Sequence, residues 1–115
     1  MPRDWKMRVQ DILDAIDKIQ RYTIGMSYDS FRTDEKTVDA VVRNFQIIGE
    51  VARHIPTYLE ERWPQAPWAD MRDMRNVVIH EYFGVSREIL WQTITKDLPS
   101  LSPLLTRILA ESQSE

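Results

Sequence analysis

The chain has 115 residues, a net charge of −3 and only 3 glycines, and 43% of its residues are hydrophobic. This length allows a single domain over residues 1–115 with one core, and the composition argues against disorder and against a turn-rich β fold. The absence of cysteine excludes disulfides, thiolate nucleophiles and zinc–thiolate clusters. The acidic balance does not indicate a general nucleic-acid-binding domain, so any RNA site must be local or shared between subunits.

The hydropathy pattern also bears on location. The first ten residues, MPRDWKMRVQ, lack the apolar stretch of a signal peptide, and no hydrophobic run approaches membrane-spanning length. Together with the lack of cysteine, this pattern predicts a cytoplasmic protein that has no membrane segment.

The first half of the chain predicts two long helices. From Trp5 to Tyr22, apolar residues recur every three or four positions, which is typical of a helix with one buried face, and Gly25 is a suitable stop. Residues 26–32 predict a connection with room for one helical turn. A second helix is expected from about Asp34 to His54, with Thr33 or Asp34 as its N-cap and a proline shortly after its end.

The second half is divided by prolines. The segment PTYLEERWPQAPW predicts a short helix that begins at Pro56 and is followed by breaks at Pro64 and Pro67. A third long helix is expected over Trp68 to Glu81, ended by Gly84. The last helical region should span Ser86 to about Leu109, split or kinked by Pro99 and Pro103. The sequence therefore predicts an all-α, up-and-down bundle of four or five helices.

The segment MRNVVIHEYFG, residues 74–84, carries the polar groups of greatest chemical interest. Asn76 and His80 are four residues apart and share a helix face, and Arg72 extends that line one turn upstream. Arg75 precedes His80 by five residues, which places it roughly 140° away around the helix. Its long side chain can still reach a ligand held near the imidazole, and the two groups can also meet across a two-fold axis between subunits.

These residue types suit RNA cleavage through the neighbouring 2′-hydroxyl. That reaction needs one group to take the hydroxyl proton, another to protonate the leaving 5′-oxygen, and a cation to stabilise the charge on phosphorus. An imidazole near a helix C-terminus can move protons, and an arginine can bind phosphate, so no metal or cofactor is required. From spacing alone, however, an arginine and a histidine on an amphipathic helix more often form a solvated face or an ion pair.

The residues RNVVIHEY resemble the motif Arg-x4-His-x-Tyr of the HepT ribonuclease toxins of the HEPN superfamily. The arginine of the motif corresponds to Arg75, the histidine to His80 and the tyrosine to Tyr82. The flanking segments AVVRNFQIIGEVARHIP, PW and HEYFGV are also similar, and the resemblance extends from residue 38 to Pro99. One position differs, because Glu81 stands where aspartate is frequent.

The resemblance implies a HEPN-like homodimer that acts as a metal-independent endoribonuclease. In that interpretation Arg75 and His80 are catalytic at a cleft between subunits, and Asn76 and Arg72 bind substrate. The resemblance also implies a type VII toxin–antitoxin pair whose antitoxin, an MntA-like nucleotidyltransferase, adenylylates Tyr82. A bulky anionic AMP group beside Arg75 would block RNA and occupy the guanidinium. The alternative is a non-catalytic helical dimer that serves as binding partner and substrate of a nucleotidyltransferase.

Other polar and aromatic residues have simpler interpretations. On the second helix, Arg43, Asn44 and Glu50 either face the same cleft or form structural ion pairs. His54 suits a capping or dipole interaction at a helix end. Two histidines 26 residues apart, without an HExxH pattern, make a poor metal-ligand set, and there is no glycine-rich phosphate loop. The tryptophans are expected to anchor the core or an interface rather than stack on bases: Trp5, Trp63, Trp68 and Trp91.

Overall fold

The computed structural model describes the backbone of residues 4–82 and 86–113, and the side chains of residues 4–75 and 86–111. Within these ranges the fold is all-α, as the sequence predicts, and contains no strand. The four long helices are α1 (Trp5–Thr23), α3 (Glu35–Ala52), α5 (Trp68–Tyr82) and α7 (Leu98–Gln113). Shorter elements are α2 (Tyr28–Arg32), α4 (Thr57–Arg62), α6 (Arg87–Gln92) and the π-helical turn η1 (Thr93–Asp97).

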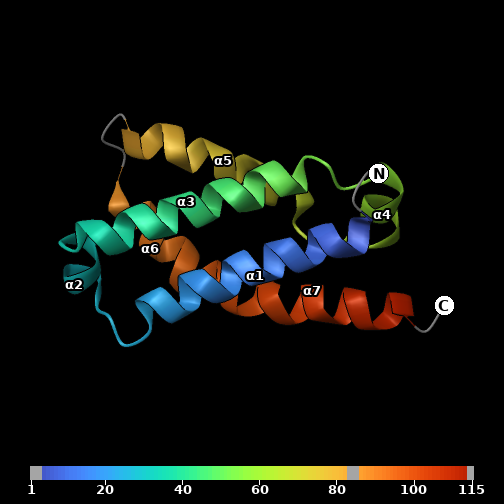
Figure 1. Ribbon diagram of the computed structural model, residues 1–115, viewed down its shortest axis with the longest axis horizontal. Coiled ribbons are helices and arrows are strands. Elements are labelled where there is room, and N and C mark those ends of the chain that lie inside the picture. Colours follow the sequence, from blue (N-terminus) through green and yellow to red (C-terminus); the bar gives the residue numbers. More distant parts are fainter. Residues whose placement is uncertain (1–3, 83–85, 114–115) are drawn as a thin grey trace.

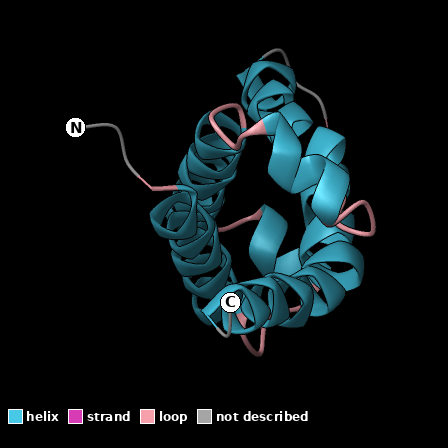
Figure 2. Ribbon diagram, turned by 90° about the vertical axis from the view of Figure 1, so that its right-hand side faces the viewer, coloured by secondary structure: helices cyan, strands magenta, loops and turns pink. Residues whose placement is uncertain are grey.

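The long helices form an up-and-down bundle. Figure 1 shows α5, α3, α1 and α7 lying side by side in this order, with successive long helices running in opposite directions. The most extensive packing is between α3 and α5 and between α1 and α3, so α3 lies at the centre of the arrangement. In the view turned by 90°, only helices and short loops appear in the described chain (Figure 2). The central helix α3 therefore supports whatever site lies on α5.

The core forms from the apolar stripes that the sequence predicts. In α1 and α3, fully buried side chains recur at helical spacing, and α7 adds a third stripe. Each stripe packs against its neighbours and removes apolar surface from water, which is the main force holding the bundle together. The buried residues of these stripes are Val9, Ile12, Ile16, Ile19, Val38, Val41, Phe45, Ile48, Leu98, Leu101, Leu105 and Ile108.

Local signals in the sequence set the ends of the first two long helices. Gly25 adopts φ 77°, a left-handed conformation that favours glycine, directly after the end of α1. At the start of α3, the Asp34 carboxylate accepts a hydrogen bond of 3.1 Å from the backbone N–H of Thr37. This bond lowers the pKa of Asp34, because it stabilises the charged form. Asp34 is therefore the N-cap, one of the two residues that the sequence offers.

The last helical region is split, as expected from its prolines, but the interruption begins before them. The backbone N–H of Leu98 donates to the carbonyl of Thr93, five residues earlier, which is the hydrogen-bond pattern of a π-helix. This wider turn directly precedes Pro99, whose ring would crowd the preceding turn of a regular α-helix. Pro103 lies inside α7 and does not end it.

The four tryptophans contribute to the core, which confirms their predicted role as anchors. Trp63 and Trp68 are buried, and Trp5 and Trp91 are partly buried against the core cluster. The ring of Trp91 lies 5.2 Å from that of Phe31 between centroids, which joins α6 to α2. None of the helices in the described ranges is long and apolar enough to cross a bilayer.

Candidate functional site

The start of α5 is fixed by aromatic and sulfur-containing side chains. The indole N–H of Trp68 donates a 2.9 Å hydrogen bond to the backbone carbonyl of Trp63, which follows α4. One turn further on, Met71 and Met74 are buried in the core. With this face of α5 held inside the bundle, the next residue, Arg75, is exposed. The predicted motif therefore begins at an exposed arginine that directly follows the buried Met74.

Gly49 allows α5 to approach α3 very closely at this point. A Cβ atom built on Gly49 would lie 2.6 Å from the backbone nitrogen of Arg75 and 2.9 Å from its Cβ. Real Cβ atoms do not make such short contacts, so any other residue would push the two helices apart. The helix backbones touch because position 49 has no side chain, and this contact places Arg75 beside the next residue of α3, Glu50.

Glu50 forms ion pairs with two arginines. Its Oε1 lies 3.5 Å from Nε of Arg75, and its Oε2 lies 3.6 Å from Nη1 of Arg53. The side chains of these three residues are each close to half exposed. The arrangement, which we call the Glu50 bridge, carries a net charge of +1. Glu50 is thus in a structural ion pair, one of the two interpretations offered by the sequence, and the same pair joins it to the motif arginine.

Arg72 has a different partner. Its Nη1 pairs with Oε1 of Glu60, which lies on α4, and both side chains are more buried than those of the Glu50 bridge. The pair ties α4 to α5 one turn before Arg75. If the guanidinium of Arg72 also contacts a substrate, it must do so either while it is paired with Glu60 or after that ion pair has broken.

The remaining polar residues predicted on α3 differ from one another. Asn44 is buried, and its side-chain amide donates a 2.8 Å hydrogen bond to the carbonyl of Ala40, one turn earlier on the same helix. Arg43 is exposed and lines a shallow groove of about 330 Å³ along α3, which Glu50 also lines. The groove therefore connects Arg43 with the carboxylate that contacts Arg75.

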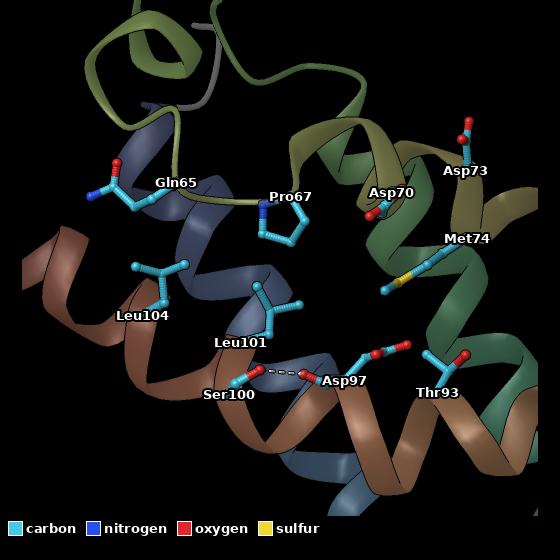
Figure 3. A pocket seen from close by; sticks show the side chains of 10 residues that line it. All are labelled: Gln65, Pro67, Asp70, Asp73, Met74, Thr93, Asp97, Ser100, Leu101 and Leu104. Atoms are coloured by element: carbon cyan, nitrogen blue, oxygen red, sulfur yellow. Dashed lines mark hydrogen bonds between the residues drawn. The ribbon is translucent and has the colours of Figure 1, made fainter.

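A separate pocket of about 500 Å³ lies between α5 and the segment η1–α7 (Figure 3). In this view Asp70 and Met74 from α5 face Asp97 and Leu101 from the opposite wall. Its apolar lining residues are accompanied by three carboxylates that repel phosphate: Asp70, Asp73 and Asp97. Arg53 and Arg75, by contrast, bring two basic groups together at the junction of α3 and α5.

The other motif residues lie on α5, whose backbone is described as far as Tyr82. The side chains of Asn76, His80 and Tyr82 fall outside the described residues, as does Gly84, the predicted helix stop. Their predicted roles therefore stay predictions. Among the described side chains there is no cluster of three or more histidine or acidic residues placed to hold a metal ion.

Arg53 is a residue that sequence reasoning did not single out. It directly follows α3, three residues after Glu50, a spacing at which opposite charges on a helix face one another. The spacing was visible in the sequence. What it did not reveal is that the same carboxylate also contacts an arginine on α5, because that contact depends on how the helices pack.

Comparison with known proteins identifies the family of this chain. The sequence model of the family described as Ribonuclease HepT-like matches residues 12–108. The chain is 41% identical over 101 residues to the probable ribonuclease HepT of Thermococcus cleftensis, covering 88% of this chain and 92% of that protein. It is 33% identical over 116 residues to a candidate RNase of Methanocaldococcus jannaschii, covering 100% of this chain and 96% of the other. No solved structure gives a significant match.

The fold is thus an all-α bundle in which an arginine-bearing helix is held against the central helix. It belongs to a class of ribonuclease-related helical domains. This chain is a member of the HepT-like ribonuclease family. Membership confirms the resemblance carried by the motif and its flanks, and it places the chain in an enzyme family whose substrate is RNA.

Proposed function

We propose that this protein is a metal-independent endoribonuclease and the toxin of a type VII toxin–antitoxin pair. The observation that carries the proposal is the placement of Arg75: it is exposed on α5, fixed against Gly49, and followed by the remaining residues of the family motif. Family membership supplies the reaction class. Arg75 binds the scissile phosphate, and His80 moves the protons.

The reaction proceeds by transfer of the phosphoryl group within the RNA. The 2′-oxygen attacks the adjacent phosphorus and loses its proton to a base, while the bond to the 5′-oxygen breaks and that oxygen takes a proton from an acid. A 2′,3′-cyclic phosphate and a 5′-hydroxyl result, so no water, metal or redox partner is consumed. Two copies of His80 in a homodimer provide both the base and the acid. Asn76 and Arg72 contact the substrate around this centre.

Control of the toxin is assigned to Tyr82. In the presence of an MntA-like nucleotidyltransferase antitoxin, its phenolic oxygen attacks the α-phosphorus of ATP, the phenol loses its proton to a base, and pyrophosphate leaves. The resulting AMP ester brings a negative charge and a large group next to Arg75, which disfavours binding of RNA phosphate.

The decisive experiment compares cleavage of cellular RNA by the purified chain, by Arg75→Ala and by His80→Ala, with EDTA present. Cleavage by the parent protein, together with its loss in both variants, is expected. Arg21→Ala is a matched control, since Arg21 is an exposed arginine that pairs with Asp17 on α1. RNA left intact by the parent protein, in the same way as by His80→Ala, would contradict the proposal.

The same samples test the alternative of a non-catalytic dimer, which the acidic net charge favours. A chain that is adenylylated by the nucleotidyltransferase but never cleaves RNA would establish that alternative. Intact-mass and peptide mapping should find AMP on Tyr82 and lose it in Tyr82→Phe. Tyr58→Phe is the control, because Tyr58 is a well exposed tyrosine on α4. Light scattering measures whether the chain is a dimer.

A further inference from the structure

The Glu50 bridge has a geometry that folding stability does not explain. Its members are 44% to 48% exposed, and the two distances of 3.5 and 3.6 Å are long for ion pairs. Exposed pairs of this kind contribute little to stability, because water screens them and two long side chains must be ordered. Yet both carboxylate oxygens are used, one for each arginine, and one of these arginines is the motif residue.

The orientation of the Arg75 contact favours binding of a second anion. Glu50 approaches Arg75 at Nε, on one side of the planar guanidinium. Arginine has five N–H donors in a fixed fork, so among the described side chains a carboxylate at Nε leaves the edge formed by the two terminal nitrogens available for phosphate. A guanidinium held in this way is oriented before substrate arrives, which reduces the entropy lost on binding.

Arg53 brings a second cation to the same place. Its Nη1 contacts the other oxygen of the Glu50 carboxylate, so the two guanidinium groups flank one small group and lie near each other. The net charge of the bridge stays positive, which suits a polyanionic strand. The groove along α3 is lined by both Glu50 and Arg43, so a further cation lies two helical turns away from the bridge.

We propose that Glu50 is a positioning residue that holds Arg75 with its free edge toward the scissile phosphate, and that Arg53 binds a neighbouring phosphate of the same RNA strand. This inference rests on the proposed function, because it assumes that Arg75 contacts the scissile phosphate. Glu50 acts only through Arg75. Removing its charge should therefore change how well the bound RNA reacts rather than whether RNA binds.

The test for Glu50 is the isosteric variant Glu50→Gln, measured by single-turnover cleavage and by RNA binding in the His80→Ala background. Cleavage should fall roughly ten- to a hundredfold, the size expected when a catalytic group is misplaced by about 1 Å. RNA binding should stay equal or become tighter, because a negative charge has been removed. Glu50→Asp, which keeps the carboxylate, should restore part of the rate.

The matched control is Asp17→Asn, since Asp17 is an exposed carboxylate that pairs with Arg21 within α1. Its cleavage rate should remain within about twofold of the parent, as expected for a surface substitution away from the site. Circular dichroism and thermal melts should show that the compared proteins are folded. A merely structural role for Glu50 would lower cleavage and RNA binding together, or neither.

The test for Arg53 is the salt dependence of RNA binding by Arg53→Ala. Loss of one phosphate contact should weaken binding and reduce the slope of log affinity against log salt by roughly one. Arg21→Ala, an exposed arginine of a different ion pair, should leave the slope unchanged.

The outcomes separate this inference from the proposed function. If Arg75→Ala abolishes cleavage while Glu50→Gln cleaves at the parent rate, the positioning role is wrong. An unchanged salt slope in Arg53→Ala would overturn the second phosphate contact. If Arg75→Ala cleaves as fast as the parent protein, the proposed function itself fails, whatever Glu50 and Arg53 do.

Discussion

Gly49 on α3 and Arg75 on α5 are in backbone contact: a Cβ atom added at Gly49 would lie 2.6 Å from the Arg75 nitrogen. The two helices could not meet this closely if position 49 carried any side chain. The candidate site depends on this contact, because the contact fixes where the motif arginine lies against α3.

Gly49→Ala should therefore destabilise the protein although alanine is the better helix former. The gain in helix propensity is about 0.5–1 kcal/mol, whereas overpacking costs about 1–3 kcal/mol, so a net loss near 1 kcal/mol is expected. Urea denaturation measures it. Gln46→Ala, at an exposed position of the same helix, should change stability by less than about 0.5 kcal/mol. An equally stable Gly49→Ala protein would show that the helices separate easily.

Asp34 should make stability depend on pH in the acid range. The hydrogen bond from the Thr37 backbone lowers its pKa below the unfolded value of 3.8. Its stabilising contribution is therefore present above that value and is lost as the pH falls through the folded-state pKa. Thermal melts between neutral and strongly acidic pH should show a smaller acid loss for Asp34→Asn than for the parent protein.

The capping role of Asp34 can be separated from its charge at neutral pH. Asn also accepts a hydrogen bond at an N-cap and should preserve most of the melting temperature, whereas Asp34→Ala should lower it. If Asp34→Ala melts at the parent temperature, the cap does not stabilise α3.

Replacing Trp68 with phenylalanine should lower the stability of the protein. Its buried indole N–H donates to the Trp63 carbonyl, and phenylalanine removes the donor and leaves a gap. Loss of the bond and of packing should cost about 1–3 kcal/mol in chemical denaturation. Trp5→Phe, at a partly buried position, provides the comparison and should cost less. Equal costs would argue that the hydrogen bond contributes nothing.

Arg72 and Glu60 offer a test of whether Arg72 has more than a structural role. With 35% and 25% of their side chains exposed, the pair should show a coupling energy no larger than about 1 kcal/mol in a double-mutant cycle with alanine. If Arg72 also binds substrate, as predicted from its helix face, Arg72→Ala should raise KM for RNA with kcat unchanged. The same rise in Glu60→Ala would assign the effect to the shape of α5 instead.

Much of the fold was predictable from short-range patterns. The apolar stripes of α1 and α3, the cap at Asp34 and the left-handed turn at Gly25 each depend on residues within a few positions of one another. The π-helical turn was harder, since prolines predict an interruption but not the position at which the backbone accommodates it.

By itself, the sequence determined the all-α class, the stop at Gly25, the cap at Asp34 and the family, because periodicity, capping residues and a spaced motif are properties of the chain alone. Only the tertiary structure decided that Glu50 contacts Arg75 and Arg53 together, that Arg72 pairs with Glu60, and that Gly49 lies against α5. The contacts of Glu50 with Arg75, of Arg72 with Glu60 and of Gly49 with α5 join residues from different helices. Their formation depends on the depth and rotation of helix packing, which no local pattern specifies.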